Sequence, residues 1–361
     1  MKLWLLALVL AGAGLRFYYA TESRPLKRDE QYRFQEIANH LEQGDGFKIG
    51  AHPTAQAMPL WPWLVSKLPD PRLAAALLST AAILLACWLA SILAGPRVAF
   101  VVAALMAFDL DQARLGGTIL TEPLFTVLLL SFACFWALRA TWFAAIFLAL
   151  AVLTRAEALL IPFALAACTR EWKRPLLVAG VVLAALAPWA WRNKERLDAF
   201  VPLTTVGGVT LHAAWNEGEM DLPFRKRGQG RSLHFPTAQE LAAAGEVAPD
   251  RQHRGDAIRF LKDHPGEALK SLLAKAMVLL TPVQRKGTSI TYALAILAAW
   301  WAVFRARATT RTMLRFAFPF LIVVTLVGLA FLAIPRYRAP YHPFVFLVAA
   351  SLFHRGSPST A

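Results

Sequence analysis

Charged residues are scarce in this sequence: they make up 17% of its 361 residues, whereas 57% of the residues are hydrophobic. A water-soluble domain carries about 25% charged residues. The deficit argues against a soluble globular protein and predicts an integral membrane protein. Acidic residues are the rarer kind, with 23 against 38 lysines and arginines and a net charge of +15. In a membrane protein such an excess suits anionic headgroups or phosphate-bearing substrates.

Three further features are scarce or missing. There are only three cysteines, Cys87, Cys134 and Cys168, and all lie within apolar runs. This argues against a disulfide framework and against a cysteine metal site. The basic residues are spread over many loops and form no single stripe, so nucleic acid is not the expected partner. No internal repeat is visible, which argues against the repeat-built transporters.

Apolar runs recur along the chain and predict an all-α fold, a polytopic bundle of membrane helices. Several runs are shorter than the ~20 residues that a simple span needs. Their flanking polar residues are therefore expected at membrane depth or along a cavity, where such groups are costly unless functional. We expect about ten spans. The runs are 2–20, 73–94, 98–108, 121–138, 142–153, 158–168, 175–191, 288–304, 316–334 and 341–353.

Lysine and arginine in the short connections set the expected orientation. Basic connections favour the cytoplasmic side, and they occur at 95–97, 139, 169–174 and 305–315. Both termini are therefore expected inside. Residues 2–20 have a cleaved signal peptide as an alternative, but aromatic residues at the end of the run favour an uncleaved first span.

The chain divides into three expected regions. Residues 1–191 form an N-terminal membrane module whose outer loop is 21–72, and residues 288–361 supply the C-terminal membrane helices. Between them, 192–287 is a polar extracytoplasmic loop with helix-like patterns near 237–245 and 251–264. The run 268–282 is interrupted by lysines and is expected to be a surface helix.

The first outer loop contains a one-sided amphipathic helix that opens with two adjacent carboxylates, Asp29 and Glu30. Glycines at positions 44 and 46 supply its stop. The carboxylates have two interpretations. They could cap the helix, since acids interact well with the helix N-terminus. They could also include a general base held at the membrane surface. The apolar positions at helical spacing are Phe34, Ile37, Ala38 and Leu41.

Four polar clusters fall on the same predicted outer face. Each has a structural alternative: Glu122 as a helix cap, Arg155 with Glu157 as an ion pair, and Arg192 with Asn193 as an interfacial anchor. The two arginines of the fourth cluster, Arg336 and Arg338, could simply bind lipid headgroups. The clusters are Asp29, Glu30 and Tyr32; Asp109, Asp111, Arg114 and Glu122; Arg155 and Glu157 with Arg192 and Asn193; and Arg336, Tyr337, Arg338 and Pro340.

The convergence of these clusters favours chemistry on a phosphate-linked lipid. Arginines hold a phosphate through paired hydrogen bonds and stabilise it as a leaving group. A carboxylate can deprotonate an acceptor hydroxyl. Carboxylates and arginines on one face of a membrane bundle therefore predict group transfer from a phosphate-linked lipid donor.

Five short motifs in order resemble the polytopic GT-C glycosyltransferases. The similarity is to the branch that holds the protein O-mannosyltransferases and the lipid A aminoarabinose transferases, and it runs from the first span to Pro340. The motifs are Asp-Glu-x-Tyr followed by Ile-Ala-x-x-Leu-x-x-Gly-x-Gly-Phe, then Leu-Thr-Glu-Pro-Leu-Phe, Leu-Thr-Arg-Ala-Glu, Pro-Trp-x-x-Arg-Asn and Arg-Tyr-Arg-x-Pro.

The resemblance implies roles for individual residues. The catalytic acid of the first outer loop maps onto Asp29, with Glu30 beside it, and Asp29 becomes the general base. Glu122 becomes an acid that orients the acceptor or supports the catalytic residues, and Tyr32, Glu157 and Asn193 are given the same supporting role. The donor phosphate is assigned to Arg155, Arg192, Arg336 and Arg338.

Two departures from the family pattern concern this chain. Ala156 stands where the family has proline in Thr-Arg-Pro-Glu, a small change that should leave the role of Arg155 intact. The chain is also short: no sizeable C-terminal soluble domain is expected, and the outer loop is modest. The acceptor, a protein or a glycolipid, is therefore left open.

The resulting hypothesis is a membrane glycosyltransferase at the outer face of the inner membrane, with its site facing the periplasm or exterior. It would use a sugar on a polyprenyl phosphate and invert the anomeric centre. No metal is assigned: Asp109-Leu-Asp111 has the spacing of a metal motif but is disfavoured as one, although a divalent ion is compatible with the family. The rival hypotheses are a lipid transporter or flippase that binds lipid phosphate, and a glycan ligase or polymerase.

Overall fold

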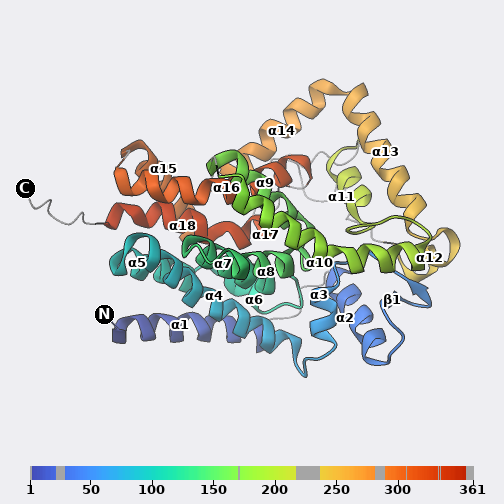
Figure 1. Cartoon of the computed structure of the whole chain (residues 1–361), viewed down its shortest axis with the longest axis horizontal. Helices are drawn as coiled ribbons and strands as arrows, with labels where there is room; N and C mark the ends of the chain where they lie inside the picture. Colours follow the sequence, from blue (N-terminus) through green and yellow to red (C-terminus); the bar gives the residue numbers. More distant parts are fainter. Residues whose placement is uncertain are drawn as a thin grey trace, which may run out of the picture.

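The computed structural model describes residues 2–21, 29–169, 171–216, 236–280, 289–305, 307–331, 333 and 335–354. This part of the chain is a bundle of helices, as Figure 1 shows. Its single pair of strands is a short antiparallel hairpin, β1 (Lys48–Ile49) and β2 (His52–Pro53). The predicted all-α membrane bundle is confirmed.

Four of the described helices are long and apolar enough to cross a membrane, and several shorter apolar helices pack among them. Large apolar side chains such as Trp142, Phe143 and Leu176 are exposed on the outside of the bundle, where lipid rather than water is the suitable solvent. The long helices are α1 (Lys2–Thr21), α4 (Pro71–Ala94), α10 (Lys173–Leu197) and α16 (Ala308–Ala330). The shorter ones are α5 (Pro96–Ala107), α7 (Glu122–Ala137), α8 (Thr141–Val152), η1 (Ala156–Leu160) with α9 (Ile161–Thr169), α15 (Ile290–Arg305) and α18 (His342–Ala350).

Local sequence fixes where these helices begin. The Asp70 side chain accepts hydrogen bonds from the first backbone N–H groups of α4, and Pro71 follows it at the first helical position. Both features are typical of a helix N-terminus. α7 likewise begins at Glu122 with Pro123 in its first turn. This start places a carboxylate at the polar end of an apolar helix.

A buried arginine joins the first helix to its neighbours. Arg16 of α1 is fully buried and donates to Ser79 of α4 and to the carbonyl oxygens of Met106 and Ala107 at the end of α5. These hydrogen bonds satisfy a guanidinium that would otherwise be costly inside the bundle. They hold α1, α4 and α5 together.

The two polar segments of the chain gather at one end of the bundle (Figure 1). Buried Glu246 joins them: its carboxylate accepts from the Thr54 hydroxyl at 2.7 Å and from the Ala55 backbone N–H at 2.6 Å. The first segment comprises α2 (Asp29–Glu42), the hairpin and α3 (Leu60–Val65). The second comprises α11 (Gly207–Ala214), α12 (Ala238–Ala244), α13 (Val247–Asp263) and α14 (Pro265–Leu280).

The helices predicted near 237–245 and 251–264 are present as α12 and α13, and the amphipathic helix of the first loop is α2. The predicted surface helix at 268–282 corresponds to α14, which is not among the helices long and apolar enough to span. Lys270 of α14 is exposed, but Lys275 is buried, with its Nζ 3.6 Å from the centre of the Trp215 ring. One face of α14 therefore packs on the bundle.

Candidate functional site

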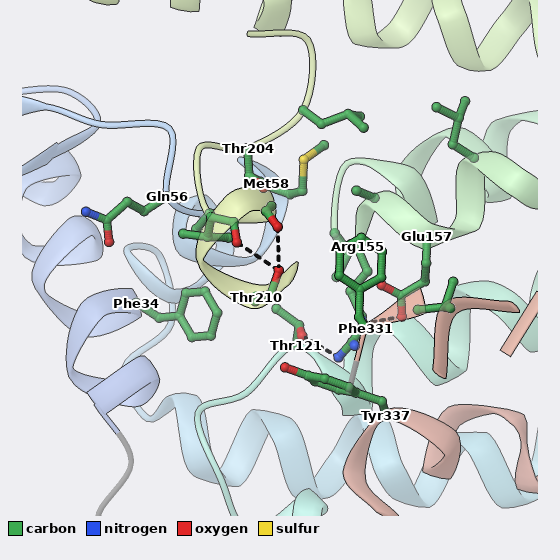
Figure 2. Close-up of a pocket in the computed structure, with 18 of the residues that line it drawn as sticks. Phe34, Gln56, Met58, Thr121, Arg155, Glu157, Thr204, Thr210, Phe331 and Tyr337 are labelled. Atoms are coloured by element: carbon green, nitrogen blue, oxygen red, sulfur yellow. Dashed lines mark hydrogen bonds and ion pairs between the residues drawn. The ribbon is translucent and has the colours of Figure 1, made fainter. Parts of the chain in front are cut away.

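A cavity of about 380 Å³ lies where the first polar segment, which contains α2, meets the ends of the bundle helices. Figure 2 shows its lining side chains, which come from segments far apart in the sequence. α2 supplies one wall, the loop before α7 and the connection between α8 and η1 supply the floor, and α11 supplies another wall. The short helix α17 (Pro335–Arg338) completes the pocket with Arg336 and Tyr337.

Four of the predicted site residues form one buried ion cluster, and three of them, Arg155, Glu157 and Arg336, line this pocket. Glu122 accepts from Arg336 Nε at 2.6 Å and from Arg155 Nη1 at 2.9 Å through the same oxygen, Oε1. Arg155 also donates from Nε to Glu157 Oε1 at 2.7 Å. The motifs Thr-Glu-Pro, Thr-Arg-Ala-Glu and Arg-Tyr-Arg are therefore in direct contact.

Burial makes this cluster electrostatically strong. Glu122 is only 1% exposed, and Arg155 and Arg336 are 9% and 11% exposed at their side chains. Burial alone would lower the pKa of Arg155, but the adjacent carboxylates of Glu157 and Glu122 raise it overall. Arg155 thus stays charged. The second carboxylate oxygen of Glu122, Oε2, has no hydrogen-bond partner within the described residues.

One aromatic ring, that of Tyr337, contacts both arginines. The guanidinium carbons of Arg155 and Arg336 each lie 5.2 Å from the centre of the Tyr337 ring. Cations over an aromatic face are attracted by its quadrupole. Arg155 also donates to Thr121 Oγ1 at 3.3 Å, as Figure 2 shows. Three kinds of contact therefore hold the Arg155 head group in one position.

Sequence reasoning missed Arg33 as a site residue, although Arg33 and Phe34 of α2 line the pocket. The signal was available in the spacing, because position 33 lies one helical turn after position 29, and residues four apart share a helix face. Tyr337 was noted within its motif but was given no role.

Two predicted residues lie on the wall behind the pocket. Arg192 donates to the carbonyl oxygens of Thr54 and Phe47 at 2.7 and 2.6 Å and is not among the residues that line the cavity. Asn193 is fully buried, and its amide donates to the Val201 carbonyl. The structure thus places both residues where they support the loops of the site.

The first-loop residues are only partly described. α2 begins at Asp29, but the side chains of Asp29 and Glu30 lie outside the described residues. Tyr32 is 63% exposed and does not line the cavity. The predicted roles of these three residues stay predictions.

Arg338 faces a second, apolar space. A groove of about 600 Å³ runs between α14, α15, α16 and α18, with Arg338 among its lining residues. The guanidinium is buried, lies 4.1 Å from the centre of the Tyr292 ring and donates from Nη1 to the Val278 carbonyl. Its Nε and Nη2 atoms have no hydrogen-bond partner in the part of the chain that the structure describes. The groove thus carries a buried cation in an otherwise apolar lining.

Asp109 and Asp111 lie apart from the pocket. Asp109 caps α6 (Leu110–Gly116) and pairs with His342 Nδ1 at 2.7 Å, and both side chains are buried. Burial alone would raise the pKa of Asp109, but His342 and the hydrogen bonds to its carboxylate lower it overall. Burial raises the pKa of Asp111. These three residues are close enough to hold a cation, but one carboxylate oxygen of Asp109 is already paired with His342 Nδ1.

Neither a protein family nor a curated protein matches this sequence. Among solved structures, the oligosaccharyltransferase of Archaeoglobus fulgidus in the apo form is similar, with a TM-score of 0.53 and 15% identity over 97% of this chain and 50% of that chain. The same enzyme tethered with an acceptor peptide gives 0.51 and 14% over 97% and 49%. ArnT from Cupriavidus metallidurans in the apo state gives 0.46 and 15% over 97% and 77%.

The similarity to the archaeal oligosaccharyltransferase defines the fold class. The chain has the GT-C fold of multi-pass membrane proteins, and the predicted resemblance is confirmed at the level of the fold. The chain spans about half the length of the archaeal oligosaccharyltransferase.

Proposed function

We propose that this chain is a membrane glycosyltransferase that moves a sugar from a polyprenyl-phosphate donor to an acceptor hydroxyl. The observation that carries the proposal is that Arg33, Arg155, Arg336 and Glu157 line one pocket, while buried Glu122 pairs with two of these arginines. A pocket of this kind suits a phosphate that must be gripped and then released as a leaving group. The GT-C fold supports the same class of reaction.

The apolar groove supports a lipid-linked donor. A small cavity between the pocket and the groove shares Val327 with the first and Leu279 and Val324 with the second, and it is lined by both Glu157 and Arg338. The isoprenoid tail would lie in the groove and the phosphate near Arg338 and Arg336. Two N–H groups of Arg338 without hydrogen-bond partners among the described residues would then gain an acceptor.

The transfer is a single displacement. The acceptor oxygen forms a bond to the anomeric carbon while the bond from that carbon to the phosphate oxygen breaks, and the electron pair leaves with the phosphate. One general base takes the acceptor proton, and no covalent sugar–enzyme intermediate forms, so the configuration inverts. We assign the base to Asp29, because α2 begins at this residue and supplies Arg33 and Phe34 to the pocket one turn later.

The proposed setting is the outer face of the inner membrane, with the site facing the periplasm or exterior. This rests on the basic connections at 95–97, 139, 169–174 and 305–315, which favour the cytoplasmic side. A divalent metal and the identity of the sugar are not part of the proposal, and the acceptor is a protein or a glycolipid. The rival is a flippase whose arginines bind the lipid phosphate in transit.

The proposal is tested in membrane vesicles that carry the protein together with cellular acceptors, to which a polyprenyl-phosphate mannose with a labelled sugar is added. Wild type should convert the donor into free polyprenyl phosphate, and Arg336→Gln should lower the rate about 10²-fold or more, because a phosphate ligand is lost. Arg311→Gln, at an exposed arginine of α16, is the matched control and should leave the rate unchanged. Movement of intact donor across the vesicle without sugar release would instead support the flippase.

A further inference from the structure

Two histidines and a carboxylate meet outside the pocket, between α11 and α13. His212 of α11 and His253 and Asp256 of α13 each offer one ligand atom, and these atoms all lie within 4.8 Å of one another. The two imidazole rings are 5.0 Å apart at their centres. The His253 Nδ1 atom is buried and has no hydrogen-bond partner among the described residues. These three side chains therefore bring two imidazole nitrogens and a carboxylate oxygen together at one place.

The packing of the two helices fixes this arrangement. The Gly208 backbone N–H donates to the Asp250 carboxylate, and a Cβ on Gly208 would lie 1.9 Å from the Asp250 carbonyl oxygen. The helices are thus in backbone contact at this point. His212 lies four residues after Gly208 and His253 three residues after Asp250, so the two rings face each other one turn further along.

We propose that His212, His253 and Asp256 form a binding site for a divalent transition-metal ion such as Zn²⁺. Two imidazole nitrogens and one carboxylate oxygen are a common three-residue ligand set for zinc, with water in the fourth position. Ligands about 2.0–2.2 Å from a tetrahedral ion lie roughly 3.3 Å from one another, so the present spacing closes by side-chain rotation. Imidazole ligands favour zinc, copper or nickel over magnesium or calcium.

The neighbouring charges leave the site accessible to a cation. Asp256 pairs with Arg259 at 3.6 Å, and the arginine side chain is 74% exposed. An exposed ion pair of this kind is weak, so it does not prevent the carboxylate from binding a metal ion. All three side chains are partly exposed, which provides a route of entry.

A metal ion here would tie together two walls of the molecule. α11 lines the pocket through Gly207 and Thr210. α13 is preceded by Glu246, which binds the Thr54 hydroxyl of the first polar segment. A bound ion would therefore hold the α11 wall against α13. The site stands on its own geometry and does not depend on the proposed transferase activity.

The test is metal binding by the full chain in detergent after treatment with a chelator. Equilibrium dialysis against Zn²⁺ should show one tightly bound ion, and bound Co²⁺ should give the visible absorption of a low-symmetry site. His253→Gln and Asp256→Asn should each weaken binding by about 10²-fold or more, since each removes a direct ligand. Zn²⁺ should also raise the Tm of wild type more than that of either variant.

The matched control is His264→Gln, which replaces an exposed histidine that follows α13 and should leave zinc binding unchanged. The proposal fails if wild type binds no zinc in excess of His253→Gln. It also fails if His253→Gln and Asp256→Asn both keep the wild-type affinity.

Discussion

Glu122 joins two arginines that line the pocket, although it does not line the pocket itself. One of its oxygens accepts from two arginines that lie 33 and 214 positions away in the sequence. Breaking a buried ion pair by removing one partner leaves an uncompensated charge in a low-dielectric site. Glu122 therefore has a structural role that is independent of any role in catalysis.

Glu122→Gln should lower the free energy of unfolding by about 3–5 kcal/mol, because Arg155 and Arg336 would lose a charged partner while remaining buried. The measurement is the thermal midpoint of the purified protein. Glu171→Gln is the control, since Glu171 pairs with Arg139 and Arg174 but is 44% exposed; it should cost no more than about 1 kcal/mol. Equal losses of unfolding free energy in the two variants would show that the buried ion cluster stabilises the fold no more than an exposed ion pair does.

The residues of the buried ion cluster could be predicted because each belongs to a recognisable sequence motif. Glu122, Arg155, Glu157 and Arg336 were named from the sequence and lie together. The direction of each side chain was not predictable, because two arginines two residues apart in a short helix diverge. Arg336 enters the pocket, whereas Arg338 enters the apolar groove.

At the scale of elements, the contact between α11 and α13 shapes one wall of the pocket. Gly208 lies at the closest approach of the two helices, and α11 also contributes Gly207 and Thr210 to the cavity. A side chain at position 208 cannot be accommodated without backbone movement.

Gly208→Ala should separate α11 from α13 and destabilise this region by at least about 1–3 kcal/mol, as overpacking does. Gly255→Ala is the matched control: it lies in α13 with open space around its Cβ position, so alanine should stabilise the helix by about 0.5–1 kcal/mol. Limited proteolysis of 192–287 and the thermal midpoint would measure both effects. A neutral Gly208→Ala would show that the close approach is absent in solution.

Glu246 joins the second polar segment to the first. Burial raises the pKa of Glu246 above its ordinary value of 4.5, so the folded state favours the protonated carboxyl. The stabilisation that Glu246 contributes is therefore fully present below pH 4.5 and is lost as the pH rises through the raised pKa.

Glu246→Ala should cost about 1–3 kcal/mol through its two lost hydrogen bonds, and the cost should be larger at pH 5 than at pH 8. The measurement is the difference in thermal midpoint between variant and wild type at each pH. Glu267→Ala, which removes a carboxylate with an exposed partner in Lys270, is the control for general charge effects. A cost that grows with pH would contradict the direction of the pKa shift.

The elements themselves were largely predictable because apolar runs and helical periodicity depend only on local sequence. What holds them together was not. Arg16 lies in the first apolar run, and its partners are hydroxyl and carbonyl groups of α4 and α5. Arg192 likewise donates to backbone carbonyls of the first loop. Backbone acceptors leave no mark in the sequence, so both anchors became visible only in the fold.

At the scale of the whole molecule, the polar pocket and the apolar groove lie on either side of α17. Tyr337 faces the pocket and the cavity behind it, and Arg338 faces that cavity and the groove. A lipid with a charged head and a long apolar tail matches this pair of spaces. Both of the preceding helices, α15 and α16, contribute apolar side chains to the groove.

The most direct measurement compares wild type with Asp29→Asn in membrane vesicles that contain cellular acceptors and are supplied with a labelled polyprenyl-phosphate sugar. Loss of a helix cap costs only about 1 kcal/mol of stability, whereas loss of a general base lowers the rate by about 10²-fold or more in a folded protein. We predict that wild type consumes the donor and that Asp29→Asn, with an unchanged thermal midpoint, does not. Equal consumption by the two proteins would contradict the assignment of the base, and donor binding without consumption by either would contradict the transferase itself.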